Sequence, residues 1–339
     1  MEEKFISVII PNRNGSATIG LSIEAALASD YPRFEVIVVD DCSTDGSVEV
    51  IRRYPCRLVR LAAHGGASKA RNRGAQESRG ELLFFTDADC LLAPGALAAA
   101  NRIATGQGPD AAVGGTYTRV PYDAGFFSLF QSVFVNYSEL KRKDDPDYLA
   151  THALAIDART FERAGGFAEE FMPILEDVEF SHRLRRRGYR LMMSPDILVQ
   201  HIFNYSLRRS LGNAFKKTKY WIVYSLKNRD LLADSGTASV ELKLNGLVFL
   251  LMALLILFGT VSGTGAAALV AAALLLAGVN VAVSKELLAA FSGTGGRAFA
   301  LRAAAYYMLV YPAAIWAGTI AGVLAYFRTT APPAGRAPQ

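Results

Sequence analysis

Two short apolar runs that end in carboxylates constrain the fold of this chain most strongly. Residues 36–39 and residues 84–86 are β-branched or aromatic. Acidic residues follow each run almost at once: Asp40, Asp41, Asp87 and Asp89. Runs of this kind are typical of buried parallel strands. Because open α/β sheets bind ligands at the C-terminal ends of their strands, the sequence predicts a ligand site beside these carboxylates.

Asp87 and Asp89 stand one residue apart at the end of the second run. Two carboxylates this close are costly to bury without a partner, and a divalent cation is the natural one. Together with nearby lysine and arginine, such a site suits a cation and a diphosphate. Surface carboxylates in a turn are the alternative, but the apolar run before them favours the ligand site.

Predicted strands and helices alternate in the first half of the chain. The strands cover residues 5–10, 35–39, 58–61 and 81–86, and the helices cover residues 17–29, 48–54 and 64–77. Further strands are predicted at 112–120, 152–156 and 197–200, further helices at 158–164 and 176–187, and a helix or flexible loop at 126–140. This order predicts an α/β fold with a right-handed, mostly parallel sheet.

The C-terminal part of the chain has a different composition. Residues 244–284 and 303–327 contain no charged residue. At roughly 20 residues per crossing, the first block is long enough for two membrane spans and the second for one. A buried core hairpin is the alternative, but uncharged runs of this length are rare in soluble domains. We therefore expect transmembrane helices at 244–262, 265–284 and 303–327, with the third either spanning, kinked at Pro312, or re-entrant.

The segment 205–229 is basic and aromatic and has no acidic residue. Such a stretch is typical of an interfacial helix against anionic headgroups. Its position next to the uncharged blocks disfavours the alternative, nucleic-acid binding. We expect a domain at 1–204, a basic interfacial segment at 205–241, a transmembrane domain at 242–328 and a disordered tail at 329–339.

The expected location is the inner (plasma) membrane, as a multi-pass protein with its first domain in the cytosol. No signal peptide precedes the first strand, and the positive charges between the uncharged blocks fit a cytosolic side. The three cysteines are odd in number and lack metal-ligand spacing, which fits a reducing compartment.

From residue 5 to about residue 205, the chain resembles the family 2 glycosyltransferases, which have the GT-A fold. The ordered elements that carry the resemblance are residues 7–12, 39–41, 43–47, 66–74, 87–89, 165–167 and 176–177. A lone Asp-x-Asp is a weak signal, whereas the whole series in this order is specific. A Rossmann dehydrogenase is disfavoured, because no Gly-x-Gly-x-x-Gly follows the first strand.

The resemblance implies a site for the donor, a nucleotide-diphosphate sugar. Asp41 would bond the nucleotide base, Asp40 would support its loop, and Arg71 would approach the nucleotide or diphosphate. Pro11, Arg13 and Lys69 complete the expected donor-binding set, together with Asp87. Arg13 stands where the family commonly has an aromatic residue, and arginine can also stack or reach a phosphate.

The resemblance also implies a bound Mg²⁺ or Mn²⁺. Asp89 would coordinate it, Asp87 would face the ribose or the metal, and His201 would lie near the metal or diphosphate. A structural role is the alternative for His201. Because charge gathers on the diphosphate as the glycosidic bond breaks, a bridging cation would stabilise the leaving group.

Asp177 is the candidate general base, and Glu176 is expected to have a supporting or substrate-binding role. Capping of the predicted helix is the alternative for Asp177. Together these features predict an inverting, metal-dependent transfer of one sugar to a hydroxyl of a lipid-linked saccharide or glycolipid. The absence of Gln-x-x-Arg-Trp after the helix favours a single addition rather than processive synthesis.

Two other functions stay open. The first is transfer to a polyprenyl phosphate, an acceptor that is already anionic and needs no base. The second is a non-catalytic, membrane-anchored subunit that binds nucleotide sugars, which would predict erosion of the acidic motifs. The acidic pairs at 87–89 and 176–177 are intact and favour the enzyme with a hydroxyl acceptor.

Overall fold

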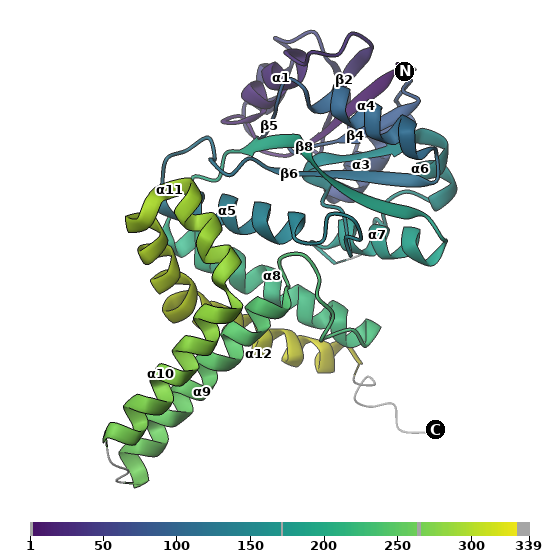
Figure 1. Cartoon of the computed structure of the whole chain (residues 1–339). Helices are drawn as coiled ribbons and strands as arrows, with labels where there is room; N and C mark the ends of the chain where they lie inside the picture. The colour runs from purple at the N-terminus through teal and green to yellow at the C-terminus, as the bar shows by residue number, and fades with distance from the viewer. Residues whose placement is uncertain (1–2, 171, 263–265, 331–339) are drawn as a thin grey trace, which may run out of the picture. The chain divides into compact units, whose positions relative to one another are not determined.

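The computed structural model describes residues 3–170, 172–262 and 266–330. The chain divides into two compact units, Met1–Asn204 and Tyr205–Gln339 (Figure 1). Each unit is described by itself.

The first unit is built on a mixed sheet of eight strands in the order β3-β2-β1-β4-β7-β6-β8-β5. Its strands are β1 (Ile6–Asn12), β2 (Phe34–Asp40), β3 (Arg57–Arg60), β4 (Leu82–Phe85), β5 (Cys90–Leu92), β6 (Ala111–Tyr117), β7 (Leu154–Asp157) and β8 (Arg190–His201). Strands β1 to β4 are parallel, whereas β7 runs antiparallel to β4 and β6. The predicted α/β sheet is therefore confirmed, with antiparallel pairs in its second half.

Seven α-helices belong to the described residues of this unit. They are α1 (Ile19–Leu27), α2 (Ser47–Ile51), α3 (Gly66–Gln76), α4 (Ala96–Gln107), α5 (Phe126–Leu140), α6 (Ala158–Ala164) and α7 (Glu176–Arg186). Of the two alternatives for residues 126–140, the helix is correct. Helix α4 and strand β5 were not predicted, and β8 begins seven residues before the predicted strand.

Helix α5 is fixed to strand β6 by polar side chains along one face. The Asn136 amide donates to the Tyr117 carbonyl at 2.7 Å, and the Thr116 hydroxyl donates to Glu139 at 2.6 Å. Both helix residues are buried. These bonds satisfy polar groups that are costly to bury alone, and they hold β6 beside the strands that end at the candidate site.

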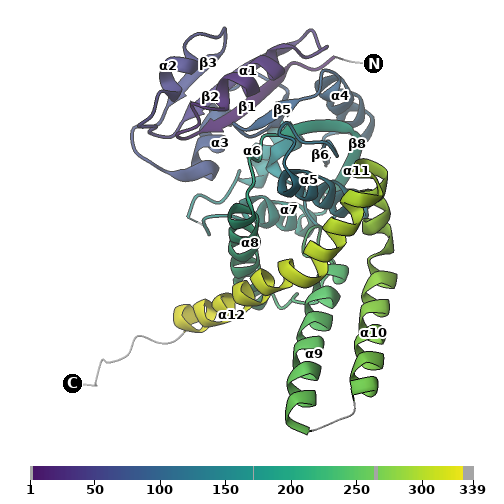
Figure 2. The ribbon, with the colours of Figure 1, turned by 90° about the vertical axis from the view of Figure 1, so that its left-hand side faces the viewer.

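The second unit is entirely helical in its described part. It contains α8 (Leu207–Asn228), α9 (Val240–Ser262), α10 (Ala266–Val283), α11 (Lys285–Ala305), the π-helix η2 (Tyr306–Val310) and α12 (Tyr311–Thr330). Figures 1 and 2 show α9 and α10 side by side, and Gly259 of α9 lies against Leu269 of α10.

By length and composition, two stretches of this unit can cross a membrane. They are Val240–Val261 and the 44-residue stretch Lys285–Arg328, whereas the apolar stretch Ala267–Val283 is shorter. The segment predicted as a third span, 303–327, lies inside that 44-residue stretch, which bends at Gly296. Of the predicted tail, residues 329 and 330 end α12, and residues 331–339 lie outside the described part.

Candidate functional site

Asp40 and Asp41 lie where strand β2 ends beside strand β1. Asp40 is fully buried and accepts hydrogen bonds from the Asn12 amide at 3.1 Å and from the Ser43 backbone N–H at 3.2 Å. Its carboxylate therefore fixes the loop that follows β2. Pro11, one residue before Asn12, is half-buried in β1.

The Asp41 carboxylate fixes the start of helix α3. It accepts from the backbone N–H groups of Gly65 and Gly66, each at 2.8 Å, and from His64 Nδ1 at 2.7 Å. The Arg13 guanidinium contacts His64 Nε2, so Nδ1 carries the imidazole proton. The acidic side chain thus neutralises the positive end of the α3 dipole. Lys69, which packs beside Gly65, is exposed.

Arg71 of helix α3 joins two carboxylates that are distant in sequence. Its guanidinium donates to Asp87 Oδ1 at 2.6 Å and to Glu176 Oε1 at 2.7 Å, and its side chain is 4% exposed. Burial raises the pKa of Asp87, but the charges of Arg71 and His152 and the Arg71 hydrogen bond outweigh it, so the pKa lies below its ordinary value. Asp87 therefore stays ionised, and the end of β4 is tied to the start of α7.

Replacing Arg71 with methionine is expected to destabilise the first unit by about 3 kcal/mol, because two largely buried carboxylates lose their counter-charge. Thermal unfolding of the full-length chain measures the loss. As a matched control, adding Asp87→Asn and Glu176→Gln to the Arg71→Met variant removes both charges and should recover most of the stability. An unfolding temperature for Arg71→Met equal to that of the unchanged protein would contradict the bridge.

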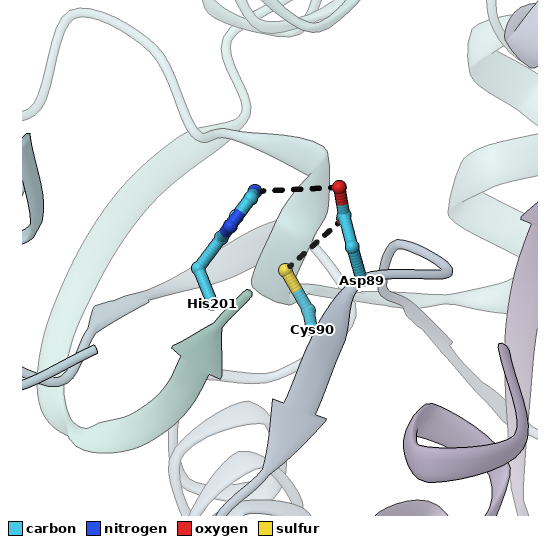
Figure 3. Close-up of side chains that lie close together, drawn as sticks. All are labelled: Asp89, Cys90 and His201. Carbon is cyan, nitrogen blue, oxygen red and sulfur yellow. Dashed lines mark hydrogen bonds and ion pairs between the residues drawn. The ribbon is translucent and has the colours of Figure 1, made fainter. Parts of the chain in front are cut away.

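Asp89, Cys90 and His201 form a potential metal site at the junction of β5 and β8. Their ligand atoms lie within 4.8 Å of one another, and Asp89 Oδ2 is 3.6 Å from His201 Nε2 (Figure 3). Burial and the charge of Asp87 raise the pKa of Asp89 to about 7. Burial also raises the pKa of the Cys90 thiol well above its ordinary value, so the thiol stays protonated and is a poor ligand.

The donor set fits a divalent ion such as Mn²⁺. A carboxylate oxygen and an imidazole nitrogen are both ligands that such ions accept. Burial and the negative charge of Asp87 raise the pKa of Asp89, an effect that a further positive counter-charge would offset. A bound cation would supply that counter-charge. Asp87, the other predicted ligand, is not a member of this cluster, and its Oδ1 accepts from Arg71.

Aromatic rings set the orientation of His201. Phe203 stacks on its imidazole at 3.9 Å, and Tyr117 meets it edge-on at 5.0 Å. Tyr117 also stacks on His152 at 4.1 Å. These contacts restrict the His201 ring to the plane in which Nε2 faces Asp89.

His152 lies at the site but was not predicted as a site residue. It is 5% exposed, its Nε2 lies 3.5 Å from Glu139, and its charge lowers the pKa of both Asp87 and Asp89. The pairing of β4 with β7 could have indicated the position of His152. Since Phe85 pairs with Leu154, the residues just before β7 lie beside those just after β4.

Glu176 and Asp177 occupy the first turn of helix α7. Asp177 is half-buried, and its Oδ1 accepts from the Val178 backbone N–H at 2.9 Å. Leu175, immediately before them, has a φ of 75°, a left-handed conformation that is uncommon for leucine. Strained backbone of this kind persists only where neighbouring contacts hold it, and it is found most often at functional sites.

The turn that leads towards α7 is held from two sides. On one side, the Asn72 side chain of α3 accepts from the Phe167 N–H at 2.9 Å and donates to the Phe167 carbonyl at 2.8 Å. On the other, Arg183 of α7 donates to the Gly166 carbonyl at 2.6 Å. Asn72 lies inside a motif quoted for the family resemblance but was not predicted as a site residue.

Residues 7–155 match the family model described as glycosyl transferase family 2. Glycosyltransferase AglE of Haloferax volcanii is 28% identical over 204 residues, 58% of this chain and 66% of AglE. The putative teichuronic acid biosynthesis glycosyltransferase TuaG of Bacillus subtilis is 34% identical over 89 residues, 25% of this chain and 35% of TuaG. This chain therefore spans only about a third to two thirds of the length of these relatives.

Among solved structures, the chain is similar to the mannosyltransferase PcManGT of Pyrobaculum calidifontis, solved in complex with GDP-Man and Mn²⁺. The TM-score is 0.59 at 22% identity, and the match covers 98% of this chain and 89% of that one. This likeness confirms the expected GT-A type of fold.

Proposed function

Since residues 7–155 of this chain match the glycosyl transferase family 2 model, we propose that the protein transfers one sugar from a nucleoside-diphosphate sugar to a hydroxyl group of a lipid-linked saccharide or glycolipid. The observation that carries the proposal is the cluster of charged side chains where β4 and β8 end. There the Asp89–His201 pair lies next to Asp87, which Arg71 ties to the first turn of α7. Groups suited to the leaving diphosphate and to the acceptor are thereby held on one rigid frame.

Asp89 and His201 would hold a Mg²⁺ or Mn²⁺ ion, which when bound stabilises the negative charge of the departing diphosphate. The loops fixed by Asp40 and Asp41, with Arg13 on the exposed side, would bind the nucleotide. The complex of the similar mannosyltransferase with GDP-Man and Mn²⁺ supports this class of donor and cation.

Asp177 would take the proton from the acceptor hydroxyl. The acceptor oxygen then forms a bond to the anomeric carbon as the bond from that carbon to the diphosphate oxygen breaks, which inverts the configuration in one step. Glu176 would orient the start of α7 through Arg71 rather than move a proton.

Two observations support a lipid-linked acceptor. The first is that the second unit contains helical sequence long and apolar enough to cross a membrane, such as Val240–Val261. The second is the loop between β6 and α5. Of the described residues before residue 205, Val120 and Tyr122 are the exposed large hydrophobic side chains, at 58% and 53%.

That loop is tethered beside the candidate metal ligand. The Tyr122 N–H donates to the His201 carbonyl at 3.1 Å, and Asp123 accepts from the Phe203 N–H at 2.9 Å. Exposed apolar side chains held next to a reaction site are suited to binding the hydrocarbon part of an acceptor.

The double variant Val120→Ser, Tyr122→Ser is expected to raise KM for a lipid-linked acceptor about tenfold, because less apolar surface leaves water on binding. KM for the nucleotide sugar should not change, and a short-chain, water-soluble acceptor should react equally well with both proteins. Steady-state kinetics with the two acceptors measure the difference. An unchanged KM for the lipid-linked acceptor would count against this class of acceptor.

The proposed location is the inner (plasma) membrane, with the first unit in the cytosol. The positive charges that flank the apolar helices support this orientation, because Lys and Arg are enriched on the cytoplasmic side of membrane spans. Lys243 lies near the start of α9, and Lys285 follows α10.

A further inference from the structure

We propose that helices α8 and α12 lie together in the plane of the membrane surface, bound to anionic lipid headgroups, and that α9 and α10 alone cross the bilayer. The inference rests on the membrane location proposed above, and it differs from the expectation of three spans. It is independent of which sugar or acceptor the enzyme uses.

Helices α8 and α12 form one packed pair. An added Cβ at Gly318 would lie 2.7 Å from the Phe215 carbonyl oxygen and 2.9 Å from Thr218 Cβ. An added Cβ at Gly322 would lie 2.6 Å from the Lys219 carbonyl oxygen. The two backbones therefore touch over more than one helical turn, as in the close packing that small residues four apart allow.

The positive charge of α8 makes it unfavourable for α12, which packs against it, to span the membrane. Helix α8 carries six cationic residues and no acidic one: Arg208, Arg209, Lys216, Lys217, Lys219 and Lys227. Gly318 and Gly322 are buried against α8 in the middle part of α12. If α12 crossed the bilayer, this contact would carry Lys216, Lys217 and Lys219 into the hydrocarbon, where lysine is strongly unfavourable.

The outer face of α12 is apolar. Ile320, Leu324 and Phe327 are 57%, 54% and 63% exposed. At 100° per residue they share one stripe, on the side of the helix opposite Gly318 and Gly322. The pair thus combines a hydrophobic stripe with a strongly cationic partner helix, which is the pattern of an element that lies in the interface.

Polar contacts place α12 and η2 at one end of the α9–α10 pair. The Asn245 amide of α9 donates to the Tyr307 carbonyl of η2 at 2.8 Å, and the Asn280 amide of α10 donates to Asn245 at 2.8 Å. The Trp316 indole of α12 donates to the Gly246 carbonyl at 2.8 Å. Both α9 positions lie in its first two turns, so α12 runs across that end of the pair (Figure 2).

Beyond this end, α9 and α10 expose apolar side chains such as Leu254, Phe258 and Leu274, at 50%, 58% and 68%. Helix α9 has 23 residues and α10 has 18, lengths within the range for crossing helices. A pair of crossings returns the chain to the side from which α9 starts. The end of α12 is then on the same side of the membrane as α8.

Depth measurements on spin labels separate the two arrangements. Single cysteines at Ala313, Ile320 and Phe327, seven residues apart on the outer stripe of α12, are labelled in the full-length protein. The protein is reconstituted in vesicles of phosphatidylcholine and phosphatidylglycerol at about 7:3, and the unsubstituted chain gives the background from native cysteines. The matched set on α9 is Leu247→Cys, Leu254→Cys and Val261→Cys.

The expected result is a similar, shallow depth at all three α12 positions and a maximum at position 254 on α9. A maximum at position 320 would mean that α12 spans the bilayer and would overturn the inference while leaving the membrane location intact. No maximum on α9 would overturn both the inference and the membrane location.

The lipid preference is tested with the same α12 labels in pure phosphatidylcholine vesicles. Their access to a water-soluble relaxation agent is expected to rise at least twofold when the anionic lipid is omitted. In the double variant Lys216→Gln, Lys217→Gln this difference between vesicle types should shrink. If the α12 labels in the protein with its native lysines are equally accessible to the agent in both vesicle types, anionic headgroups are refuted as the partner.

Discussion

Replacing Asp89 with alanine is expected to lower kcat for sugar transfer by about 10³-fold or more while the protein stays folded. The physical reason for the lost activity is that the proposed divalent cation would lose its carboxylate ligand, and with it several kcal/mol of stabilisation of the leaving diphosphate. Transfer of labelled sugar in the presence of Mn²⁺ measures the effect.

The fold should survive because the folded protein raises the pKa of Asp89 to about 7. A carboxylate whose folded-state pKa lies above its unfolded value destabilises the fold as the pH rises above the unfolded value, and does so fully above its folded-state pKa, here about 7. Its removal therefore should not lower the unfolding temperature. The control is Asp196→Ala, which removes an exposed carboxylate paired with Arg102 and should leave transfer unchanged.

Removal of the cation should have the same effect as Asp89→Ala. Chelation with EDTA is expected to stop transfer, and added Mn²⁺ or Mg²⁺ to restore it. Direct Mn²⁺ titration followed by electron paramagnetic resonance should show binding to the unchanged protein and none to the Asp89→Ala variant. Full turnover in a metal-free preparation would refute the assignment.

Asp177→Asn is expected to lower kcat by about 10²–10⁴-fold with little change in KM for the donor. The amide keeps the shape and most hydrogen bonds of the carboxylate but cannot accept a proton. Pre-steady-state and steady-state kinetics with a saturating acceptor measure the effect. The control is Glu162→Gln, an exposed carboxylate on α6 outside the site. An unchanged kcat would favour a polyprenyl-phosphate acceptor, which needs no base.

The parallel half of the sheet was predictable because its strands are short, largely apolar runs that alternate with helices. Helix α4 was missed because its alanine-rich sequence gives little contrast between faces, and β5 because it has only three residues. Strand β8 begins at Arg190, but Pro195 in its middle suggests an interruption from sequence alone. The structure accommodates it where the pairing of β6 with β8 shifts register after Gly114.

The site was only partly predictable, because some of its contacts join residues that are far apart in the sequence. The acidic residues could be placed at a common sheet edge, because parallel strands end together. The Arg71 bridge to Glu176 joins residues more than a hundred positions apart, and no local sequence pattern indicates such a contact. The same holds for His152, whose position depends on the antiparallel pairing of β4 with β7.

The proposed function is the transfer of a sugar from a nucleoside-diphosphate donor to a lipid-linked acceptor. It is tested most directly by incubating the purified full-length protein with a panel of radiolabelled nucleotide sugars, a membrane lipid extract and Mn²⁺. Extraction into organic solvent then separates glycosylated lipid from unreacted donor. We expect label from one donor in the organic phase, absent without lipid extract, with EDTA, and with the Asp89→Ala variant. Label that appears equally in the EDTA or Asp89→Ala samples, or no label from any donor, would contradict the account.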